Sequence, residues 1–308
     1  MGIRYRSAHK IGRVRLSDYC PLSVQKASSL FPSLCMPRRT LSSLHPLFYT
    51  LAVQRKQLAR RLTWLMHRDQ FATARQGASL PFRITSHQSL LIRRLGNVDL
   101  QLQYNKVHNL KLAIREIDGV VIEPGQTLSL WRLIGPATKE RGYMEGLILS
   151  NGESKVGIGG GLCQLANLVY WMALHSPLEV TERHHHSFDL FPDSGRTVPF
   201  GTGAALFYNY MDLQVHNPTK AAVQLRLWMT EDHLKGELRS AEKVDLAYSI
   251  MEKHHRYLTD GTQQYRANEI WRQTRSRETG VVLDEALLYK NLSLMKYQPP
   301  EGMFVERL

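Results

Sequence analysis

The sequence contains little cysteine and no long hydrophobic run. Its three cysteines, Cys20, Cys35 and Cys163, are odd in number and widely spaced, which excludes a disulfide framework and paired CxxC zinc knuckles and fits a reducing compartment. No apolar stretch approaches the ~20 residues that cross a membrane, and the basic start MGIRYRSAHKIGRVRL lacks the apolar centre of a secretory signal. Arg6 stands where a myristoylation motif requires Ser or Thr. We therefore expect a cytoplasmic protein.

Acidic residues are scarce in the first quarter of the chain, where the positive charge is concentrated. The formal net charge is +13, and residues 1–75 contain fourteen Lys or Arg against Asp18 and Asp69, whereas the remainder is close to neutral. No zinc finger, aromatic-rich sheet signature or other recognition motif accompanies this charge, so a nucleic-acid partner is not expected. Residues 1–44 are rich in Arg, Ser and Pro without a sustained period and are predicted to be a disordered basic extension.

A basic amphipathic helix is predicted over residues 45–75. Its apolar residues recur every three or four positions with basic residues between them: Leu47, Phe48, Leu51, Leu58, Leu62 and Leu65, with Arg55, Lys56, Arg60 and Arg61. This pattern suits peripheral contact with an anionic membrane surface. It is also typical of an ordinary helix that docks on the protein and leaves a solvated basic face, which is the more common arrangement.

The remainder of the chain predicts an α+β fold: a single mixed domain with a Gly-rich loop leading into a helix, followed by a β-rich C-terminal half. We expect a core over 76–240 and a β-rich C-terminal extension of that core over 241–308. Helices are expected at 105–117 and 162–174, and strands at 178–188, 204–217, 221–229 and 233–240. Near the C-terminus, Asp260-Gly261 indicates a hairpin and residues 285–294 a helix.

A cysteine follows three glycines in GIGGGLCQ, residues 157–164. Cys163 falls in the first turn of the helix predicted there, where unpaired amide groups and the helix dipole favour a thiolate. The stretch lacks the Lys-Ser/Thr of a P-loop and the spacing of a dinucleotide motif. A reactive thiol is therefore favoured over a nucleotide site.

Three consecutive histidines follow in LEVTERHHHSF, residues 178–188. On a strand with a period of two, His184 and His186 share a face with Glu182, and His185 points away. Three interpretations are open for Cys163 with His184 and His186: a thiolate–imidazole pair oriented by an acid such as Asp189, a zinc site with an open position, and a structural or ligand-binding cluster.

Five ordered blocks within about 105–217 resemble the VanW family, named for an accessory protein of vancomycin-resistance gene clusters. They are PGQTLSLWRLIG, RGYMEGLILSNGE, GGGLCQLANLVYW, ERHHHSFDLFPDSGRTVPFGTGA and FYNYMDLQVHN. The family pattern carries over to Pro124, Gly125, Gly142, Tyr143, Gly159, Gly160, Gly161, Cys163, Gln164, Arg183, His184, His186 and Ser187. The resemblance implies a bacterial protein linked to the cell envelope and glycopeptide resistance. Many relatives have an Asp after the histidines that Gly195–Val198 lacks here. If that Asp is the third member of a triad in the relatives, Asp189 or Asp193 replaces it in this chain.

The working hypothesis is acyl transfer or amide hydrolysis on a peptidoglycan-type peptide, without a cofactor. Cys163 is the nucleophile, His184 or His186 the general base and Asp189 the orienting acid. Substrate-binding residues are Gly159, Gly160, Gly161 and Gln164, as oxyanion donors, with Arg183, Ser187 and Arg196. The alternatives are a non-catalytic envelope-related binding module and a zinc site at Cys163, His184 and His186.

Overall fold

The computed structural model describes residues 46–93, 99–150, 153–185, 188–190, 197–209, 211–300 and 302–307. Its helices are α2 (Pro46–Met66), η3 (Arg68–Gln70), α3 (Leu100–Ile117), α4 (Leu130–Ile134), η4 (Lys139–Arg141) and α5 (Cys163–Leu174). Its strands are β1 (Phe82–Leu90), β2 (Val121–Ile122), β3 (Thr127–Ser129), β4 (Glu145–Ser150), β5 (Glu153–Ile158), β6 (Glu179–Glu182), β7 (Phe188–Asp189), β8 (Gln214–His216), β9 (Val223–Met229), β10 (His233–Ser240), β11 (Leu246–Thr259), β12 (Gln264–Ser276), β13 (Val282–Met295) and β14 (Val305–Arg307). The α+β class and the β-rich C-terminal half are confirmed.

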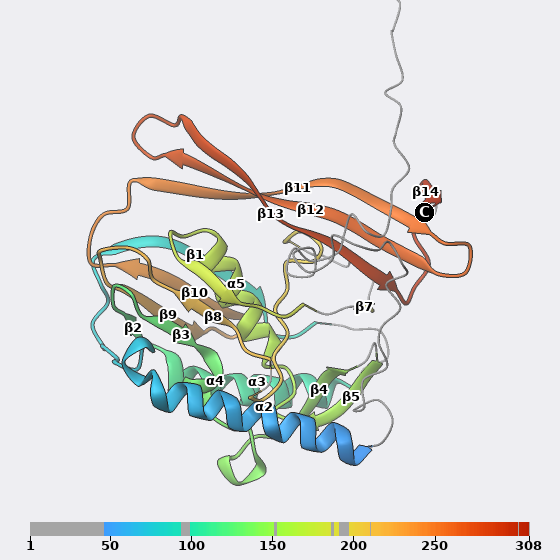
Figure 1. Cartoon of the computed structure of the whole chain (residues 1–308), viewed down its shortest axis with the longest axis horizontal. Helices are drawn as coiled ribbons and strands as arrows, with labels where there is room; N and C mark the ends of the chain where they lie inside the picture. The colour runs from blue at the N-terminus through green and yellow to red at the C-terminus, as the bar shows by residue number, and fades with distance from the viewer. Residues whose placement is uncertain are drawn as a thin grey trace, which may run out of the picture.

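The body of the molecule is built on an antiparallel sheet in the order β1-β10-β9-β2 (Figure 1). Strand β10 alternates between half-buried and buried residues along its whole length, so one face of the sheet packs inward. Helices α3 and α5 supply the other side of the core through Leu110, Ala113, Leu165 and Met172, all of which are fully buried. A second sheet, β3-β8-β6, and the hairpin β4-β5 complete the body.

The C-terminal part forms a long twisted sheet that crosses the top of the body in Figure 1, in the order β14-β11-β12-β13-β7. The predicted hairpin at Asp260-Gly261 is confirmed, since the Asp260 carboxylate accepts from the amides of Thr262 (2.8 Å) and Gln263 (2.7 Å). The predicted helix at 285–294 is wrong. That segment is part of β13, because pairing with β12 along its length overrides the helical propensity of its Ala, Leu and Glu residues.

Helix α2 lies along the outside of the body (Figure 1). Its inner face is polar: Gln57 donates to the Tyr208 carbonyl (2.8 Å) and Arg60 pairs with Glu182, while Trp64 packs against the core. Helix α2 therefore docks on the protein, as one of the two interpretations expects, but through the face that carries Gln57 and Arg60, because these contacts turn the leucines outward. In the part of the chain that the structure describes, no helix is long and apolar enough to span a membrane.

Candidate functional site

A pocket of about 380 Å³ lies where α3, α5, β1, the segment 197–203 and β13 meet. Its polar lining includes His87, Arg93, Lys106, Cys163, Gln164 and His185. Its apolar lining includes Leu147, Leu149, Leu168, Trp171 and Phe200. We call it the Lys106 pocket. It brings Cys163 together with Gly161, Gln164 and Asp189 of the predicted site.

Cys163 begins α5, as the sequence predicts, and its sulfur faces the backbone of Leu206. The Leu206 amide donates to Sγ at 3.5 Å. Burial raises the pKa of the Cys163 thiol, although the hydrogen bond from Leu206 partly opposes that shift. Within the described residues, no hydrogen bond joins Cys163 to an imidazole. These surroundings favour the neutral thiol.

The glycines before Cys163 allow two close approaches. A Cβ on Gly160 would lie 2.1 Å from the backbone carbon of Gly146, and a Cβ on Gly161 would lie 2.1 Å from Cγ of Lys106. The amides of Gly159 and Gly160 already donate to the carbonyls of Met144 (3.0 Å) and Gly157 (3.2 Å), respectively. The turn therefore serves to pack β4 and to admit the Lys106 side chain.

Gln164 also lies in the pocket wall. Its Nε2 donates to Ser89 Oγ (2.9 Å) and to the Leu90 carbonyl (2.8 Å), which ties the first turn of α5 to the end of β1.

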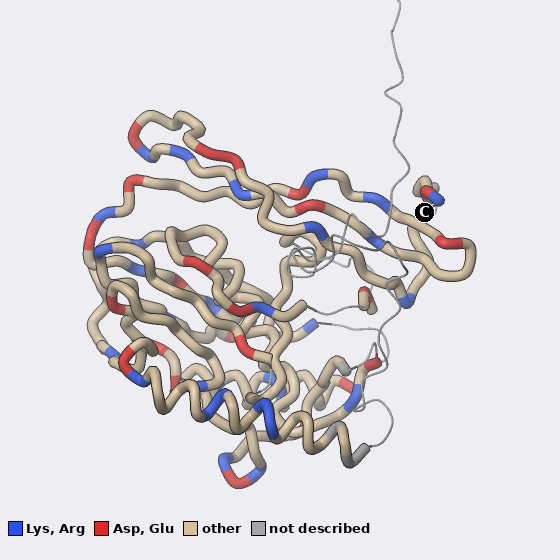
Figure 2. The backbone as a smooth tube through the Cα atoms, in the orientation of Figure 1, with Lys and Arg blue, Asp and Glu red and all other residues tan. Residues whose placement is uncertain are grey.

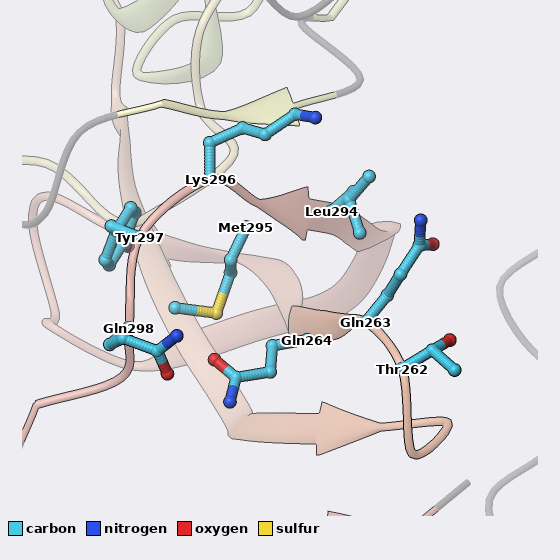
Figure 3. Close-up of a pocket in the computed structure, with 8 residues that line it drawn as sticks. All are labelled: Thr262, Gln263, Gln264, Leu294, Met295, Lys296, Tyr297 and Gln298. Atoms are coloured by element: carbon cyan, nitrogen blue, oxygen red, sulfur yellow. The ribbon is translucent and has the colours of Figure 1, made fainter.

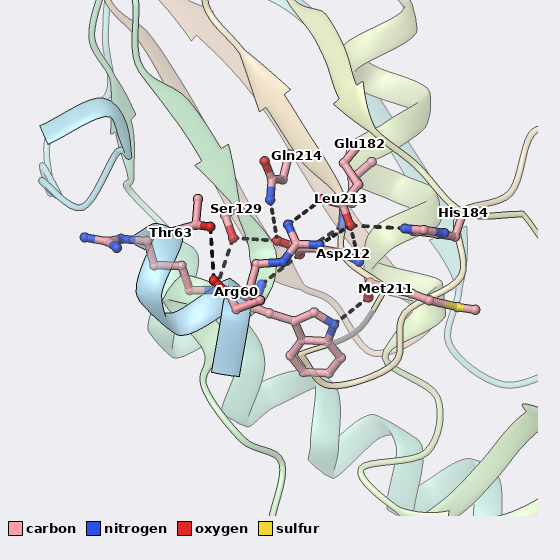
Figure 4. Close-up of polar contacts among 12 residues, drawn as sticks. Arg60, Thr63, Ser129, Glu182, His184, Met211, Asp212, Leu213 and Gln214 are labelled. Atoms are coloured by element: carbon pink, nitrogen blue, oxygen red, sulfur yellow. Dashed lines mark hydrogen bonds and ion pairs between the residues drawn. The ribbon is translucent and has the colours of Figure 1, made fainter. Parts of the chain in front are cut away.

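His184 belongs to a polar cluster that holds α2 in place (Figure 4). Its Nε2 lies 3.1 Å from Glu182 Oε1, and Arg60 binds the same carboxylate through both terminal nitrogens at 2.5 and 2.6 Å. Burial opposes ionisation of Glu182, but the hydrogen bonds from His184 and Arg60 outweigh it and lower its pKa to about 2. Glu182 thus stays ionised and fixes both partners. His184 does not line the Lys106 pocket as the described residues define it.

Asp212 extends this cluster into the core. Its carboxylate accepts from Ser129 Oγ (2.5 Å) and from the Trp131 amide (3.0 Å), and its own amide donates to Glu182 (3.1 Å; Figure 4). Burial raises the pKa of Asp212 to about 6, despite the hydrogen bonds from Ser129 and Trp131. It stabilises the loop that leads to β8.

The expectation that His185 points away from the site is wrong. Strand β6 ends at Glu182, so the two-residue alternation stops before the histidines, and His185 lines the Lys106 pocket. Burial, with the charges of Arg183 and His184, lowers the pKa of His185 and favours its neutral form at pH 7. Three predicted site residues, His186, Ser187 and Arg196, lie outside the described residues.

Asp189 and Arg183 both join the body to the C-terminal sheet. The Asp189 carboxylate accepts from Tyr297 Oη (2.7 Å) and lies 3.4 Å from Arg266 Nη1, in a buried ion pair. Arg183 donates to the Gly203 carbonyl (2.9 Å), and its guanidinium lies 4.4 Å from the centre of the Tyr289 ring. Neither side chain contacts Cys163 or His184 through a hydrogen bond among the described residues.

Sequence reasoning missed Lys106. Its Nζ donates to Gln103 Oε1 (2.8 Å), and the residue is buried. Burial, with the nearby charge of Arg93, lowers the pKa of Lys106 to about 8. No carboxylate among the described residues pairs with it. The signal was available, because Lys106 falls on the inward stripe of α3 that also carries Leu110 and Ala113.

The described residues contain no group of three His, Cys, Asp or Glu side chains placed to hold a metal ion. The zinc alternative depends on His186, whose position is not described, so it stays a prediction. A second pocket, of about 500 Å³, lies between the start of β12 and the end of β13 (Figure 3). It is lined by Thr262 to Gln264 and Leu294 to Gln298 and includes none of the predicted site residues.

The fold and the site together define an α+β protein with a polar pocket lined in part by a Gly-Gly-Gly-Leu-Cys turn. Residues 105–239 match the family described as VanW like protein. The chain is 30% identical over 228 residues to the Vancomycin B-type resistance protein VanW of Enterococcus faecalis. The aligned region covers 74% of this chain and 83% of that protein. It is 26% identical over 125 residues to the Uncharacterized protein YoaR of Bacillus subtilis, and this aligned region covers 40% of this chain and 39% of that protein. No solved structure matches significantly. The chain belongs to the VanW family, which confirms the resemblance of the sequence blocks.

Proposed function

We propose that this protein is linked to the bacterial cell envelope and to glycopeptide resistance because it binds a peptide of the cell-wall-precursor type in the Lys106 pocket. The name of its Enterococcus faecalis relative supports the link to resistance. The protein would act in the cytoplasm, at the inner face of the membrane. The observation that carries the proposal is the buried ammonium group of Lys106 at the pocket wall, with Gln103 as its hydrogen-bond acceptor.

A carboxylate is the ligand group that this ammonium group accommodates best. Lys has three donors, and the hydrogen bond to Gln103 uses one of them. Burial makes its positive charge costly, and an anion bound beside it would offset that cost. Arg93 adds a second positive charge to the lining.

The rest of the lining suits a peptide. Gln164 and Asn291 offer side-chain oxygens that can accept from peptide N–H groups, since their side-chain nitrogens already donate within the protein. Nδ2 of Asn167 can donate to a peptide C=O group, and Trp171 and Leu168 provide an apolar wall. The pocket therefore combines one cationic end with neutral polar and apolar surface, which matches a short peptide with a terminal carboxylate.

The test compares two ligands that differ in one group. A synthetic muramyl-type pentapeptide with a free C-terminal carboxylate should bind the full chain at least about tenfold more tightly than its C-terminal amide, because a charge-assisted hydrogen bond contributes about 1.5–3 kcal/mol. Isothermal titration calorimetry at low and moderate salt measures both. Equal affinity, or no heat from either peptide, would contradict the proposal.

Thiol-dependent acyl transfer is the second candidate, favoured by the presence of Cys163 and His185 in one pocket. The imidazole of His185 would take the Sγ proton as Sγ bonds to the acyl carbon. The amide C–N bond would then break, and the leaving amine would receive that proton.

The pH dependence of Cys163 alkylation separates the two candidates. Because burial raises the thiol pKa, we expect slow reaction with iodoacetamide and an apparent pKa above the ~8.5 of a free thiol. Mass spectrometry follows Cys163 in the wild type, in His185→Ala, and in His184→Ala as a matched control outside the pocket. A low apparent pKa that rises only in His185→Ala would instead establish a thiolate–imidazole pair. Zinc content measured on the same samples tests the metal alternative.

A further inference from the structure

Helix α2 presents an apolar row to solvent on the side away from the body. The exposed fractions are Phe48 51%, Leu51 60%, Leu58 58%, Leu62 48%, Leu65 70% and Met66 70%. These residues recur at helical spacing and share one face. From the geometry we infer that α2 is a membrane-surface helix, which lies in the headgroup region of an anionic bilayer.

The row is fixed in its outward orientation. Arg60 on the opposite face binds the Glu182 carboxylate through both terminal nitrogens, and Gln57 donates to Tyr208. Trp64, one turn beyond Arg60, packs against the core, and Arg132 donates to its carbonyl at 2.8 Å. Rolling α2 to bury its leucines on the body would break all of these contacts. The leucines of the row therefore stay outside the core of the described body, where a partner can reach them.

The basic residues beside the apolar row indicate that its partner is anionic. α2 contains no acidic residue. Lys56 and Arg61 are exposed and flank the apolar row on its two sides, and Arg55 lies within it. Basic side chains of this length can keep their charge among lipid headgroups while their stems cover apolar surface. Figure 2 shows the basic residues spaced along the helix.

A second copy of the chain fits this face less well. A symmetric dimer would bring the same face of two copies together, and the cations on each would then face the cations on the other. Anionic lipid headgroups offer the opposite charge along the whole length of α2, with acyl chains beneath for the leucines. The bilayer is therefore the occupant that both the apolar and the charged residues favour.

Vesicle co-sedimentation with the full chain tests this inference. We expect binding to vesicles of phosphatidylcholine with phosphatidylglycerol, much weaker binding to phosphatidylcholine alone, and a decline as salt rises. Leu58→Glu/Leu62→Glu should reduce binding at least tenfold, and Arg55→Gln/Lys56→Gln/Arg61→Gln should do the same. All five positions are exposed and lie outside the Arg60–Glu182 contact, so the fold should be retained, as circular dichroism can verify.

The matched control is Val156→Glu/Val281→Glu, which adds the same charge at two exposed apolar positions that are not part of α2. It should bind vesicles like the wild type. Three results would overturn the inference: no vesicle binding by the wild type, equal loss in the control, or full binding by Leu58→Glu/Leu62→Glu. A concentration-dependent dimer in analytical ultracentrifugation that only the Leu58→Glu/Leu62→Glu variant loses would assign the face to a second copy and also overturn it.

Discussion

Replacing Lys106 with methionine should abolish the preference for a peptide carboxylate and at the same time stabilise the unliganded protein. The loss of the ammonium group removes the charge partner of the ligand, so the pentapeptide should bind at least about tenfold more weakly. Methionine has a similar length and carries no charge to bury. At pH 7 we expect the free energy of unfolding to rise by about 1–3 kcal/mol, because replacing a buried charge with an apolar side chain is often stabilising.

The pH dependence of stability gives a second measure of the same group. The pKa of Lys106 is about 8 in the folded protein and near 10.5 when the chain is unfolded. Between these values the unfolded state binds more protons, so this group makes the wild type more stable as pH rises from about 8 to 10.5. Lys106→Met should lack that rise. Urea denaturation at several pH values measures it.

Lys111→Met is the matched control, because Lys111 lies on the same helix and is exposed. It should change neither peptide binding nor the pH dependence of unfolding. If Lys106→Met binds the carboxylate peptide as well as the wild type does, Lys106 is not the anchor, whatever the effect on stability.

Replacing Asp189 with alanine should cost about 3 kcal/mol of stability, since removal of one partner leaves a buried guanidinium group without its carboxylate. Arg266 lies 3.4 Å from that carboxylate, and Tyr297 donates to it. Strand β7, which contains Asp189, also pairs with β13. The C-terminal sheet should therefore loosen from the body, and chemical denaturation with limited proteolysis would detect this.

Asp284→Ala provides the comparison for Asp189→Ala, because it removes an exposed carboxylate from the same C-terminal sheet. Its stability should match the wild type. A wild-type stability for Asp189→Ala, with a changed pH dependence of Cys163 alkylation, would return Asp189 to the role of an orienting acid.

Local patterns predicted the elements whose ends carry strong signals. Helix α5 begins at Cys163 and ends before Pro177, as expected, because glycines with positive φ form the turn before it and proline cannot continue a helix. Strands β9 and β10 were predictable because apolar and polar residues alternate along their sequences, and the hairpin was predictable because Asp260-Gly261 is a typical turn pair. The place of Cys163 in the first turn of α5 was also predictable, whereas the pocket that it lines was not.

Long-range contacts decided the features that the sequence did not predict. The residues at 285–294 of β13 predict a helix from the sequence alone, but they form a strand because they pair with β12. His184 and His185 lie in different places for two reasons. Strand β6 ends at Glu182, before the histidines, and Glu182, which contacts His184, is held by Arg60 from a distant part of the sequence. The outward leucines of α2 depend on the same contact. Lys106 was the one omission with a local signal, a charged residue on the inward stripe of its helix.

The most direct test of the account is a thermodynamic cycle that combines two proteins with two ligands. Calorimetry would measure the carboxylate and amide pentapeptides against the wild type and Lys106→Met. We predict that the wild type prefers the carboxylate at least about tenfold, that the variant does not distinguish the two, and that the coupling energy is therefore at least about 1.4 kcal/mol. A coupling energy of zero, with the carboxylate preferred equally by both proteins or by neither, would contradict the assignment of the Lys106 pocket as a carboxylate-binding site.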